Sequence, residues 1–558
     1  MLRKTIKSYG PAGLLFFCLL LLAPVFVRAQ QKTITGRVTS SETKEPVSNA
    51  TVMIKGTSRG VVTNAEGHYS IPVNAGETLT FSAVGYTAVD RKADGLSEIS
   101  VALESIGKQE DEVVVTALGI RREEKVLGYS MSTVKGEELT DALSNNWTDA
   151  LTGKVAGLNL LKSGGGPSGS NQIILRGETS LTGDNSALIV VDGVVVSGAS
   201  GTMTGNGSGN YLSGDAPVDF GSGLADINPS DIESVSVLKG PGASALYGAR
   251  GAHGAIIITT KQGSKGKKGI GMAFNSNTTL GFINRWPDYQ YEYGQGVGGG
   301  DLYYSYGQSE DGASTLSTSS AWGPRFDGQM YYQYNPDSAW YRIKPPERTL
   351  WKAYPNNRKD FFRPSVTLTN SLSLSGGNQA TTVRLSYTNV VNKWIVPNTG
   401  YGRNTIALTL KHNVTDKLSV ATNINFNNRI SDNLPNTGYN NQTIMYFMRG
   451  ITPNMNLDWF KQYWRPGREG IEQTTPFSTL LDNPYLQAYE IINSQNKNNF
   501  TGTVQANYAF SEQWNLMVRT GIDFQYDQRK MRRPFDTYNF LYGYYRETNI
   551  YTQETNSD

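Results

Sequence analysis

The residue types that most often carry out chemistry are scarce in this chain. Its three histidines lie in three different regions, and its single cysteine, Cys18, lies close to the amino terminus. A Ser–His–Asp or Cys–His arrangement therefore cannot be proposed, and we expect no catalytic residues and no enzyme activity. His68 stands beside Glu66, but a single histidine in a turn is far more often a turn residue than a metal ligand. The sequence predicts neither a metal site nor a cofactor.

A glycine-rich turn, Gly240-Pro241-Gly242, invites a nucleotide-binding interpretation. The turn lacks the Gly-Lys-Ser/Thr ending of a phosphate-binding loop, and no Gly-x-Gly-x-x-Gly motif follows a strand. We therefore expect Gly240 and Gly242 to allow a close approach of backbone segments inside a packed domain.

A different kind of chemistry is suggested by DEVVVTALGI, residues 111–120. Three consecutive valines and Thr116 favour a strand, yet charged residues flank the stretch on both sides. The backbone of such a segment can bind the edge of a partner sheet with little dependence on side chains, and the charges discourage self-pairing. The simpler alternative, that Val113–Thr116 adds a strand to a neighbouring domain, is equally compatible with the periodicity.

The first residues predict a secretory signal. Arg3, Lys4 and Lys7 precede an apolar segment, residues 14–27, that is shorter than the ~20 residues a membrane-spanning helix needs. We expect cleavage between Ala29 and Gln30, which removes Cys18 and leaves a mature chain without cysteine. An exported protein without disulfides is typical of a bacterial envelope.

The composition narrows the possible partners. The net charge is only +3 and no basic block is present, which argues against nucleic acid. The chain contains 60 Gly, 31 Tyr and 19 Phe but no later apolar run long enough for a helical membrane span. If the chain crosses a membrane it must do so with strands, because only helices and closed barrels satisfy their backbone groups in lipid.

Two domains are predicted before residue 263. Residues 32–104 read as a small β-sandwich of short strands separated by turns, with strands at 33–38, 51–54, 68–71, 78–83 and 99–103. Residues 126–262 read as an α+β domain, with a capped helix at 145–151, a short helix at 243–247 and strands at 173–175, 232–238 and 255–260. Asp192 and Gly193 separate two β-branched runs, 188–191 and 194–196, and so predict a tight hairpin.

From about residue 268 apolar and polar residues alternate over long stretches, for example at 366–374, 406–411, 418–427 and 514–526. Alternation sustained for about ten residues is what a tilted membrane strand requires, with one face on lipid and one on a wet lumen. The connections at 375–380, 412–417 and 511–513 are short, whereas residues 284–362 and 431–496 are long. This contrast is typical of outer-membrane barrels; a soluble sandwich is the alternative.

With these parts in this order, the chain resembles the SusC/RagA family of TonB-linked outer-membrane transporters. The most specific motifs are DEVVVTALG, DALTGKVAGLNLL, IILRGETSL, ALIVVDGVVV and the stretch DINPSDIESVSVLKGPGASALYGARGAHGAIIITTKQG. Residues 36–73 also resemble a carboxypeptidase-regulatory-like domain, an accessory β-module without a catalytic set. The resemblance implies a mainly β protein with five parts: a signal peptide (1–29), the β-sandwich (30–106), a linker (107–125), an α+β plug domain (126–262) and part of a large antiparallel transmembrane β-barrel (263–558).

The resemblance also implies roles for named residues. Residues 111–118 look like the family's TonB box, a strand captured by a periplasmic energy-transducing protein; they are Asp111, Glu112, Val113, Val114, Val115, Thr116, Ala117 and Leu118. Arg176 and Arg250 look like buried or half-buried plug residues that pair with inward-facing barrel carboxylates. Asp192, Gly193, Gly240 and Gly242 belong to the plug motifs as well.

The implied function is energy-coupled import of a large nutrient, an oligosaccharide or a peptide, across the bacterial outer membrane. The implied partners are TonB with its inner-membrane motor, a SusD-like surface lipoprotein and outer-membrane lipid, with the sandwich and plug facing the periplasm. The alternative is a receptor or adhesin that displays ligand-binding loops and moves nothing. Plugged barrels have about 22 strands, whereas residues 268–558 leave room for about seven to nine, so we expect the chain to be part of a longer protein.

Overall fold

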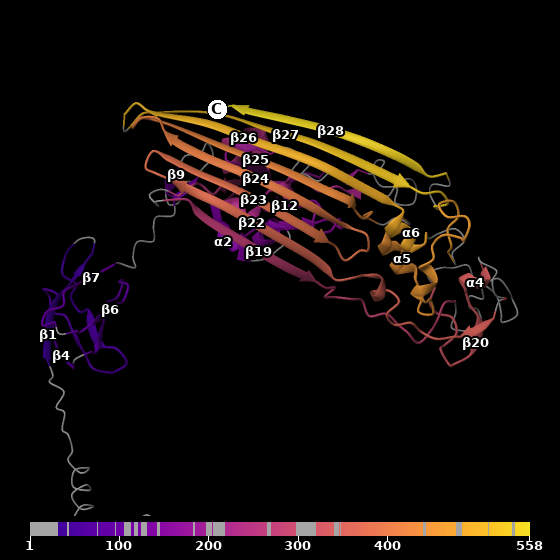
Figure 1. Cartoon of the computed structure of the whole chain (residues 1–558), viewed down its shortest axis with the longest axis horizontal. Coiled ribbons are helices and arrows are strands. Elements are labelled where there is room, and N and C mark those ends of the chain that lie inside the picture. The colour runs from indigo at the N-terminus through magenta and orange to yellow at the C-terminus, as the bar shows by residue number, and fades with distance from the viewer. Residues whose placement is uncertain are drawn as a thin grey trace, which may run out of the picture. The chain divides into compact units, whose positions relative to one another are not determined.

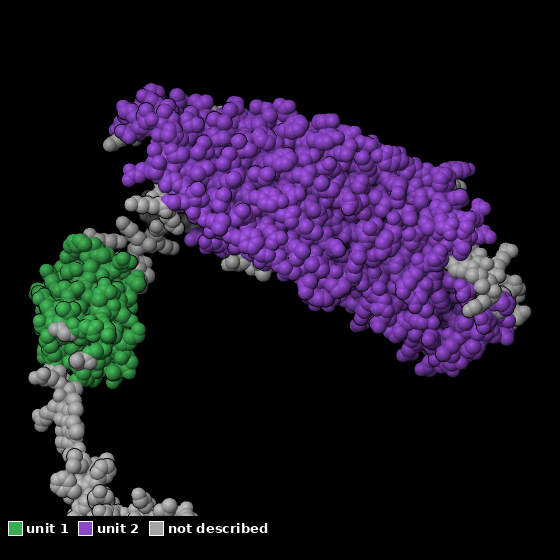
Figure 2. Space-filling view, viewed as in Figure 1, with its two compact units in different colours: residues 1–113 green, residues 114–558 purple. Residues whose placement is uncertain are grey.

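The chain separates into two compact units, residues 1–113 and 114–558, in the computed structural model (Figure 2). The structure describes residues 32–41, 44–74, 76–94, 96–104, 113–115, 121–123, 131–141, 146–181, 185–196, 203–204, 218–264, 269–296, 320–339, 345, 347–438, 442–475, 482–511, 513–537 and 542–557. The proposed signal segment with its cleavage site, Ala29 and Gln30, lies outside the described residues.

The first unit is a β-sandwich. One sheet has the order β4-β1-β7 and the other β3-β2-β5-β6. The strands are β1 (Lys32–Ser40), β2 (Thr51–Ile54), β3 (Gly60–Val62), β4 (His68–Val73), β5 (Thr78–Ser82), β6 (Val89–Lys92) and β7 (Val101–Leu103). Alternate residues of the strands, such as Val38, Val52, Ile71 and Phe81, meet in one apolar core. The sequence missed β3 and β6, which are short and mostly exposed.

The flanked segment after the sandwich forms a two-stranded ribbon. Strand β8 (Val113–Val115) pairs with β9 (Arg121–Glu123). Each has a single strand neighbour among the described residues, so β8 is a strand of neither the sandwich nor the following domain there. Residues 111, 112 and 116–118 lie outside the described part.

The α+β domain is built on a mixed sheet of order β10-β17-β18-β13-β14. The strands of this sheet are β10 (Met131–Lys135), β13 (Leu188–Val191), β14 (Val194–Val195), β17 (Ile232–Leu238) and β18 (Ala255–Thr260). Two separate pairs are formed by β11 (Leu158–Lys162) with β12 (Asn171–Leu175) and by β15 (Met203–Thr204) with β16 (Val218–Asp219). The helices are α2 (Gly136–Asp141), η3 (Trp147–Leu151), η4 (Gly223–Asp226), η5 (Pro229–Asp231), α3 (Pro241–Tyr247) and η6 (Gly248–Gly251). Trp147, Leu151, Ile189 and Ile256 lie in its apolar core.

The remaining strands form one antiparallel sheet of eight (Figure 1). In order across the sheet they are β19 (Gly271–Gly281), β22 (Ser365–Gly377), β23 (Thr381–Lys393), β24 (Gly400–Asn413), β25 (Leu418–Asn433), β26 (Ile492–Ala509), β27 (Asn515–Arg533) and β28 (Tyr544–Ser557). Each strand pairs with the next along the chain, so the sheet is an up-and-down meander that holds the α+β domain against one face.

The two faces of this sheet have opposite polarity. On the face away from the α+β domain apolar side chains are exposed, for example Leu385, Ile406 and Val504 at 43%, 47% and 48%. On the inner face polar and charged side chains are buried, among them Arg384, Thr405, Asn427, Arg429, Asp523 and Asp527. A water-soluble sandwich would show the reverse, so the polarity contradicts that alternative and matches a membrane sheet with a polar lumen.

The ends of the sheet differ as the sequence predicts. Short turns join β22 to β23, β24 to β25 and β26 to β27, whereas the other end carries long segments. These segments are folded: they contain α4 (Pro336–Ala339), η7 (Lys359–Phe361), α5 (Ile444–Gly450), η8 (Leu457–Phe460), α6 (Pro484–Tyr489) and the pair β20 (Met330–Tyr332) and β21 (Arg348–Leu350). Phe447 and Phe460 centre an apolar cluster there.

Across the parts of the chain that the structure describes, no helix has the length and apolar character needed to span a bilayer.

Candidate functional site

The α+β domain is fastened to the inner face of the sheet by buried ion pairs. Asp226, at the end of η4, lies 3.2 Å from the Arg429 guanidinium of β25 and 2.6 Å from Nζ of Lys497 on β26. Asp231, at the end of η5, lies 2.8 Å from the Arg384 guanidinium of β23. We call these two carboxylates with Arg384, Arg429 and Lys497 the carboxylate latch.

The latch side chains are removed from water. Asp226, Asp231, Lys497 and Arg384 are 4–7% exposed, and Arg429 is 1% exposed. Burial by itself raises the pKa of Asp226, but the positive charges of Arg429, Lys497 and Arg403 outweigh it and hold the pKa below its ordinary value. Asp226 is therefore a carboxylate that needs its cations, because a buried charge left without a partner is strongly destabilising.

Further hydrogen bonds extend the latch along the segment that carries it. Ser386 donates its hydroxyl to Asp231 over 2.7 Å, and Asn228 donates its amide to Thr388 over 2.9 Å. The carbonyl of Phe220 accepts hydrogen bonds from Arg429 and from Gln495. Arg403 donates to the carbonyl of Ala225 over 2.6 Å. Residues 220–231 are thus bound to four consecutive strands, β23 to β26.

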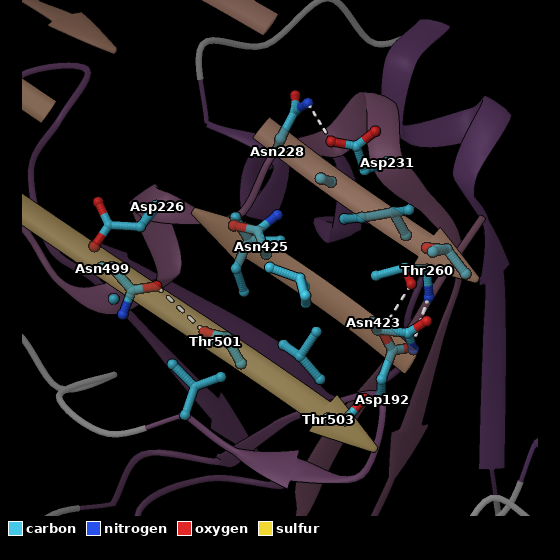
Figure 3. Close-up of a pocket in the computed structure, with 18 of the residues that line it drawn as sticks. Asp192, Asp226, Asn228, Asp231, Thr260, Asn423, Asn425, Asn499, Thr501 and Thr503 are labelled. Atoms are coloured by element: carbon cyan, nitrogen blue, oxygen red, sulfur yellow. Dashed lines mark hydrogen bonds between the residues drawn. The ribbon is translucent and has the colours of Figure 1, made fainter. Parts of the chain in front are cut away.

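A small cavity of about 60 Å³ lies between this segment and the sheet (Figure 3). Figure 3 shows Asp192, Asp226 and Asp231 at separate points around it, with Asn423, Asn425, Asn499, Thr501 and Thr503 contributed by sheet strands. Asp192 accepts hydrogen bonds from the amide and hydroxyl of Thr260 at 3.0 and 2.7 Å. Burial raises the pKa of Asp192 despite these bonds. The carboxylate joins the β13–β14 turn to the end of β18.

The hairpin predicted at Asp192-Gly193 is confirmed. Val191 pairs with Val194, and the two intervening residues have φ of 47° and 87°, the left-handed values that a tight two-residue turn requires. The turn packs against the sheet: a Cβ on Gly193 would overlap the Arg519 guanidinium, and a Cβ on Gly521 would overlap Val194. Because the turn has Gly193 and the sheet has Gly521 at these points, the two can approach this closely.

The expectation for the two arginines was half right. Arg176 and Arg250 are both exposed rather than buried, because Arg176 follows the last residue of β12 and Arg250 lies in a surface turn. Arg250 does pair with a carboxylate on the inner face of the sheet, Glu554 of β28, at 2.5 Å. Burial has little part in this pair, since the Arg250 side chain is 53% exposed.

The close approach at the glycine turn is made by a side chain and not, as expected, by a second backbone segment. Gly240 has φ of 72°, and a Cβ there would lie 3.0 Å from Nη1 of Arg176. The structure therefore brings together Arg176 and Gly240, which the motifs place far apart in sequence, while Gly242 lies in the first turn of α3.

The latch residues were not identified from the sequence, although a signal for them exists. The latch cations occupy the polar phase of alternating strands, the phase that faces the lumen; they are Arg384, Arg429 and Lys497. Two other arginines, Arg403 and Arg519, occupy the same phase. Charged residues at such positions need carboxylate or carbonyl partners. The partners, Asp226 and Asp231, stand in a loop without periodicity.

Comparison with known proteins identifies the first two folded parts. Residues 34–115 match the CarboxypepD_reg-like domain, and residues 124–255 match the TonB-dependent receptor plug domain.

The whole chain has curated relatives. It is 27% identical over 556 residues to the TonB-dependent receptor SusC of Bacteroides thetaiotaomicron, covering 94% of this chain and 48% of SusC. It is 25% identical to the TonB-dependent receptor P3 of Formosa agariphila, covering 98% of this chain and 46% of P3. The chain thus spans about half the length of these relatives.

Solved structures show the same fold. The RagAB peptide importer in its open-open state superposes with a TM-score of 0.59 at 18% identity, covering 80% of this chain and 46% of that one. Its closed-closed state gives a TM-score of 0.54. From here the α+β domain is called the plug and the eight-stranded sheet the barrel wall. The chain is a relative of the SusC/RagA family of TonB-linked outer-membrane transporters, with a carboxypeptidase-regulatory-like domain ahead of its plug.

Proposed function

We propose that this chain takes part in TonB-dependent import of a large nutrient across the bacterial outer membrane. The observation that carries the proposal is a plug fastened by buried ion pairs to the polar face of a sheet whose opposite face is apolar. A wall of this polarity suits lipid outside and a polar lumen inside. A plug held by polar bonds can be released and rebound, because water can replace each broken bond.

The energy for release would enter through residues 111–118. β8 uses one edge to pair with β9, and a partner strand at its other edge would add further backbone hydrogen bonds. A pull on this ribbon reaches β10 of the plug after a few residues. By the same proposal, the pulling partner is TonB with its inner-membrane motor.

The outer partner would be a SusD-like surface lipoprotein, which closes over the folded segments at the long-loop end. The substrate would be an oligosaccharide or a peptide. The similarity to SusC and to the RagAB peptide importer supports a nutrient of this kind.

The test is Val114→Pro, compared with Val114→Thr. Proline removes a backbone N–H and fixes φ, so it prevents strand pairing at β8, whereas threonine keeps the β-branched side chain and the N–H. In cells carrying the complete gene, we expect Val114→Pro to abolish accumulation of labelled nutrient while surface binding persists. Val114→Thr should accumulate normally.

The same measurement separates import from display. A receptor or adhesin that moves nothing would bind the nutrient equally with both variants and with the proton gradient dissipated. Normal accumulation in Val114→Pro would overturn the coupling proposed for residues 111–118.

A further inference from the structure

A second, larger cavity separates the plug from the barrel wall. It encloses about 370 Å³, within the range of about 300–1,000 Å³ that is usual for small-molecule sites. The plug contributes α2, the loop around η5 and Lys261, and the wall contributes strands β19, β22, β23 and β24. The carboxylate latch lies outside its lining.

Hydrogen-bonding groups dominate the lining of this cavity. Hydroxyls come from Thr140 and Ser230 of the plug and from Thr367, Thr369 and Ser371 of β22, and amides come from asparagines on both sides. Such groups bind the polar surface of a sugar or a peptide, because each can donate or accept a hydrogen bond.

The charge of the lining is one-sided. Among the described residues that line it, the charged ones are Lys261 and Arg403, while the carboxylates that interact with them, Asp226, Asp231, Glu137 and Glu233, are not part of the lining. Arg403 is 7% exposed; one terminal nitrogen donates to Ala225, but its buried Nε has no hydrogen-bond partner among the described residues. A buried N–H without an acceptor is costly, so an acceptor supplied by a ligand would be favourable.

Lys261 is the second cation of the lining. Nζ donates to the carbonyl of Ser230 over 3.0 Å, a neutral acceptor. Burial, followed by the nearby charge of Arg384, lowers the pKa of Lys261, and the carboxylates of Asp231, Glu137 and Glu233 offset this only in part. Lys261 thus lies among both positive and negative side chains, in a partly buried position where a ligand carboxylate would add a charge-assisted hydrogen bond to Nζ.

We propose that this cavity binds a polar ligand through a carboxylate, which Lys261 and Arg403 neutralise while the hydroxyl and amide groups bind the rest of the molecule. Charge-assisted hydrogen bonds of this kind are stronger than neutral ones. The carboxylate can belong to a uronic acid of an acidic oligosaccharide or to the end of a peptide. The inference that this site lies on the uptake route rests on the proposed function. The inference that it binds a carboxylate does not.

The test uses the purified protein, expressed from the complete gene, and isothermal titration calorimetry with two matched pairs of probes. Galacturonate is compared with galactose, and N-acetylglycine with its neutral amide. We expect the carboxylate of at least one pair to bind at least tenfold more tightly than its neutral partner. The pair that does so identifies the source of the carboxylate.

Variants test whether the carboxylate probe binds in this cavity. Lys261→Gln and Arg403→Gln should each weaken carboxylate binding about tenfold, Lys261→Arg should retain it, and Thr369→Trp should block it by filling space. Lys162→Gln, which removes an exposed plug cation paired with Asp149, is the control and should bind as the parent does. Hydrogen exchange of the plug core verifies that each variant is folded.

Equal affinity for charged and neutral probes, or unchanged affinity in folded Lys261→Gln, would overturn the proposal. Neither result depends on TonB or on accumulation in cells, so the import proposal would stand untouched.

Discussion

Asp226 shows how much a single side chain contributes to holding the plug. It faces two cations, Arg429 and Lys497, and all three side chains are at most 5% exposed. Removing one member of such a group leaves buried charge without a counterion, which typically costs about 3–5 kcal/mol. We expect Asp226→Ala to speed hydrogen exchange of plug residues 218–238 about 100-fold or more, as local opening becomes easier.

The control for Asp226→Ala is Glu178→Ala, which removes an exposed carboxylate from the same domain. Its exchange rates should match those of the parent. If Asp226→Ala also exchanges at the parental rate, the latch does not hold this segment.

Gly193 and Gly177 offer a matched pair of glycines with positive φ, 87° and 91°. Alanine at either position pays the backbone penalty of about 1 kcal/mol that left-handed conformations impose on other residues. Only at Gly193 would the added methyl also overlap a wall side chain, Arg519, whereas Gly177 has open space. Gly193→Ala should therefore lower the thermal unfolding midpoint of the plug more than Gly177→Ala, and equal shifts would show that the contact with Arg519 is unimportant.

For single residues, the sequence predicts local backbone conformations better than it predicts contacts between distant residues. The Asp-Gly pair specifies its own turn, because positive φ at two adjacent residues is a local requirement. The contact of that turn with Arg519 joins residues more than 300 positions apart, as does the pair of Arg250 with Glu554. Local steric rules carry no information about such partners, so Arg250 could be assigned a carboxylate but not a particular one.

Among the elements, the sandwich provides a test of pH dependence. Tyr69 of β4 is 5% exposed and donates its hydroxyl to the carbonyl of Ile99 over 2.7 Å. Burial, aided by the charge of Glu98, raises the pKa of Tyr69 to about 12 from its ordinary value of 10.0. The folded domain therefore favours the neutral phenol over the ionised one. The contribution of this neutral phenol to the stability of the sandwich is complete below pH 10 and is lost as the pH rises toward 12.

The measurement is urea unfolding of the isolated sandwich, residues 32–104, between pH 8 and 11.5. We expect the parent to lose about 2 kcal/mol of stability relative to Tyr69→Phe over this range, since each pKa unit is worth about 1.4 kcal/mol and most of the shift from 10.0 to about 12 is titrated by pH 11.5. Parallel pH curves for the two proteins would mean that the phenol ionises as easily in the fold as in the unfolded chain.

Elements were predictable where side-chain periodicity and burial agree. β13, β17 and β18 begin and end at the predicted residues because turn or loop residues bound each of them, β13 and β18 as nearly continuous β-branched runs and β17 as an alternating one. The predicted helix at 145–151 is instead a 3-10 turn, Trp147–Leu151, capped by the side chain of Asn146. The cap was recognisable from the sequence, but the tertiary contact of this turn, the hydrogen bond from the Trp147 indole to the carbonyl of Leu224, was not.

At the scale of the whole molecule, the alternation of the wall strands predicts a sheet with one apolar and one polar face, and the eight strands fall within the expected seven to nine. What alternation cannot predict is the site between plug and wall. The latch pairs Asp226 with Lys497 and Asp231 with Arg384, and the cavity beside Lys261 draws its lining from four wall strands. These groups meet only after the plug has packed inside the wall.

The opposite polarity of the two faces gives the sharpest test of membrane insertion. Val504 and Gln505 are neighbours on β26; Val504 is 48% exposed on the apolar face, and Gln505 belongs to the phase that faces the plug. Arginine on a lipid-facing position costs about 2–4 kcal/mol at the bilayer midplane and less toward the interface, whereas a lumen position keeps the charge in a polar setting. Val504→Arg should therefore reduce the folded fraction in lipid vesicles, measured by heat-modifiable gel mobility, by the equivalent of about 1–3 kcal/mol. Gln505→Arg should reduce it less, since its only added cost is repulsion from Arg519, which lies opposite on β27. The two variants carry the same charge one residue apart, so equal losses would show that the apolar face of this sheet does not contact lipid.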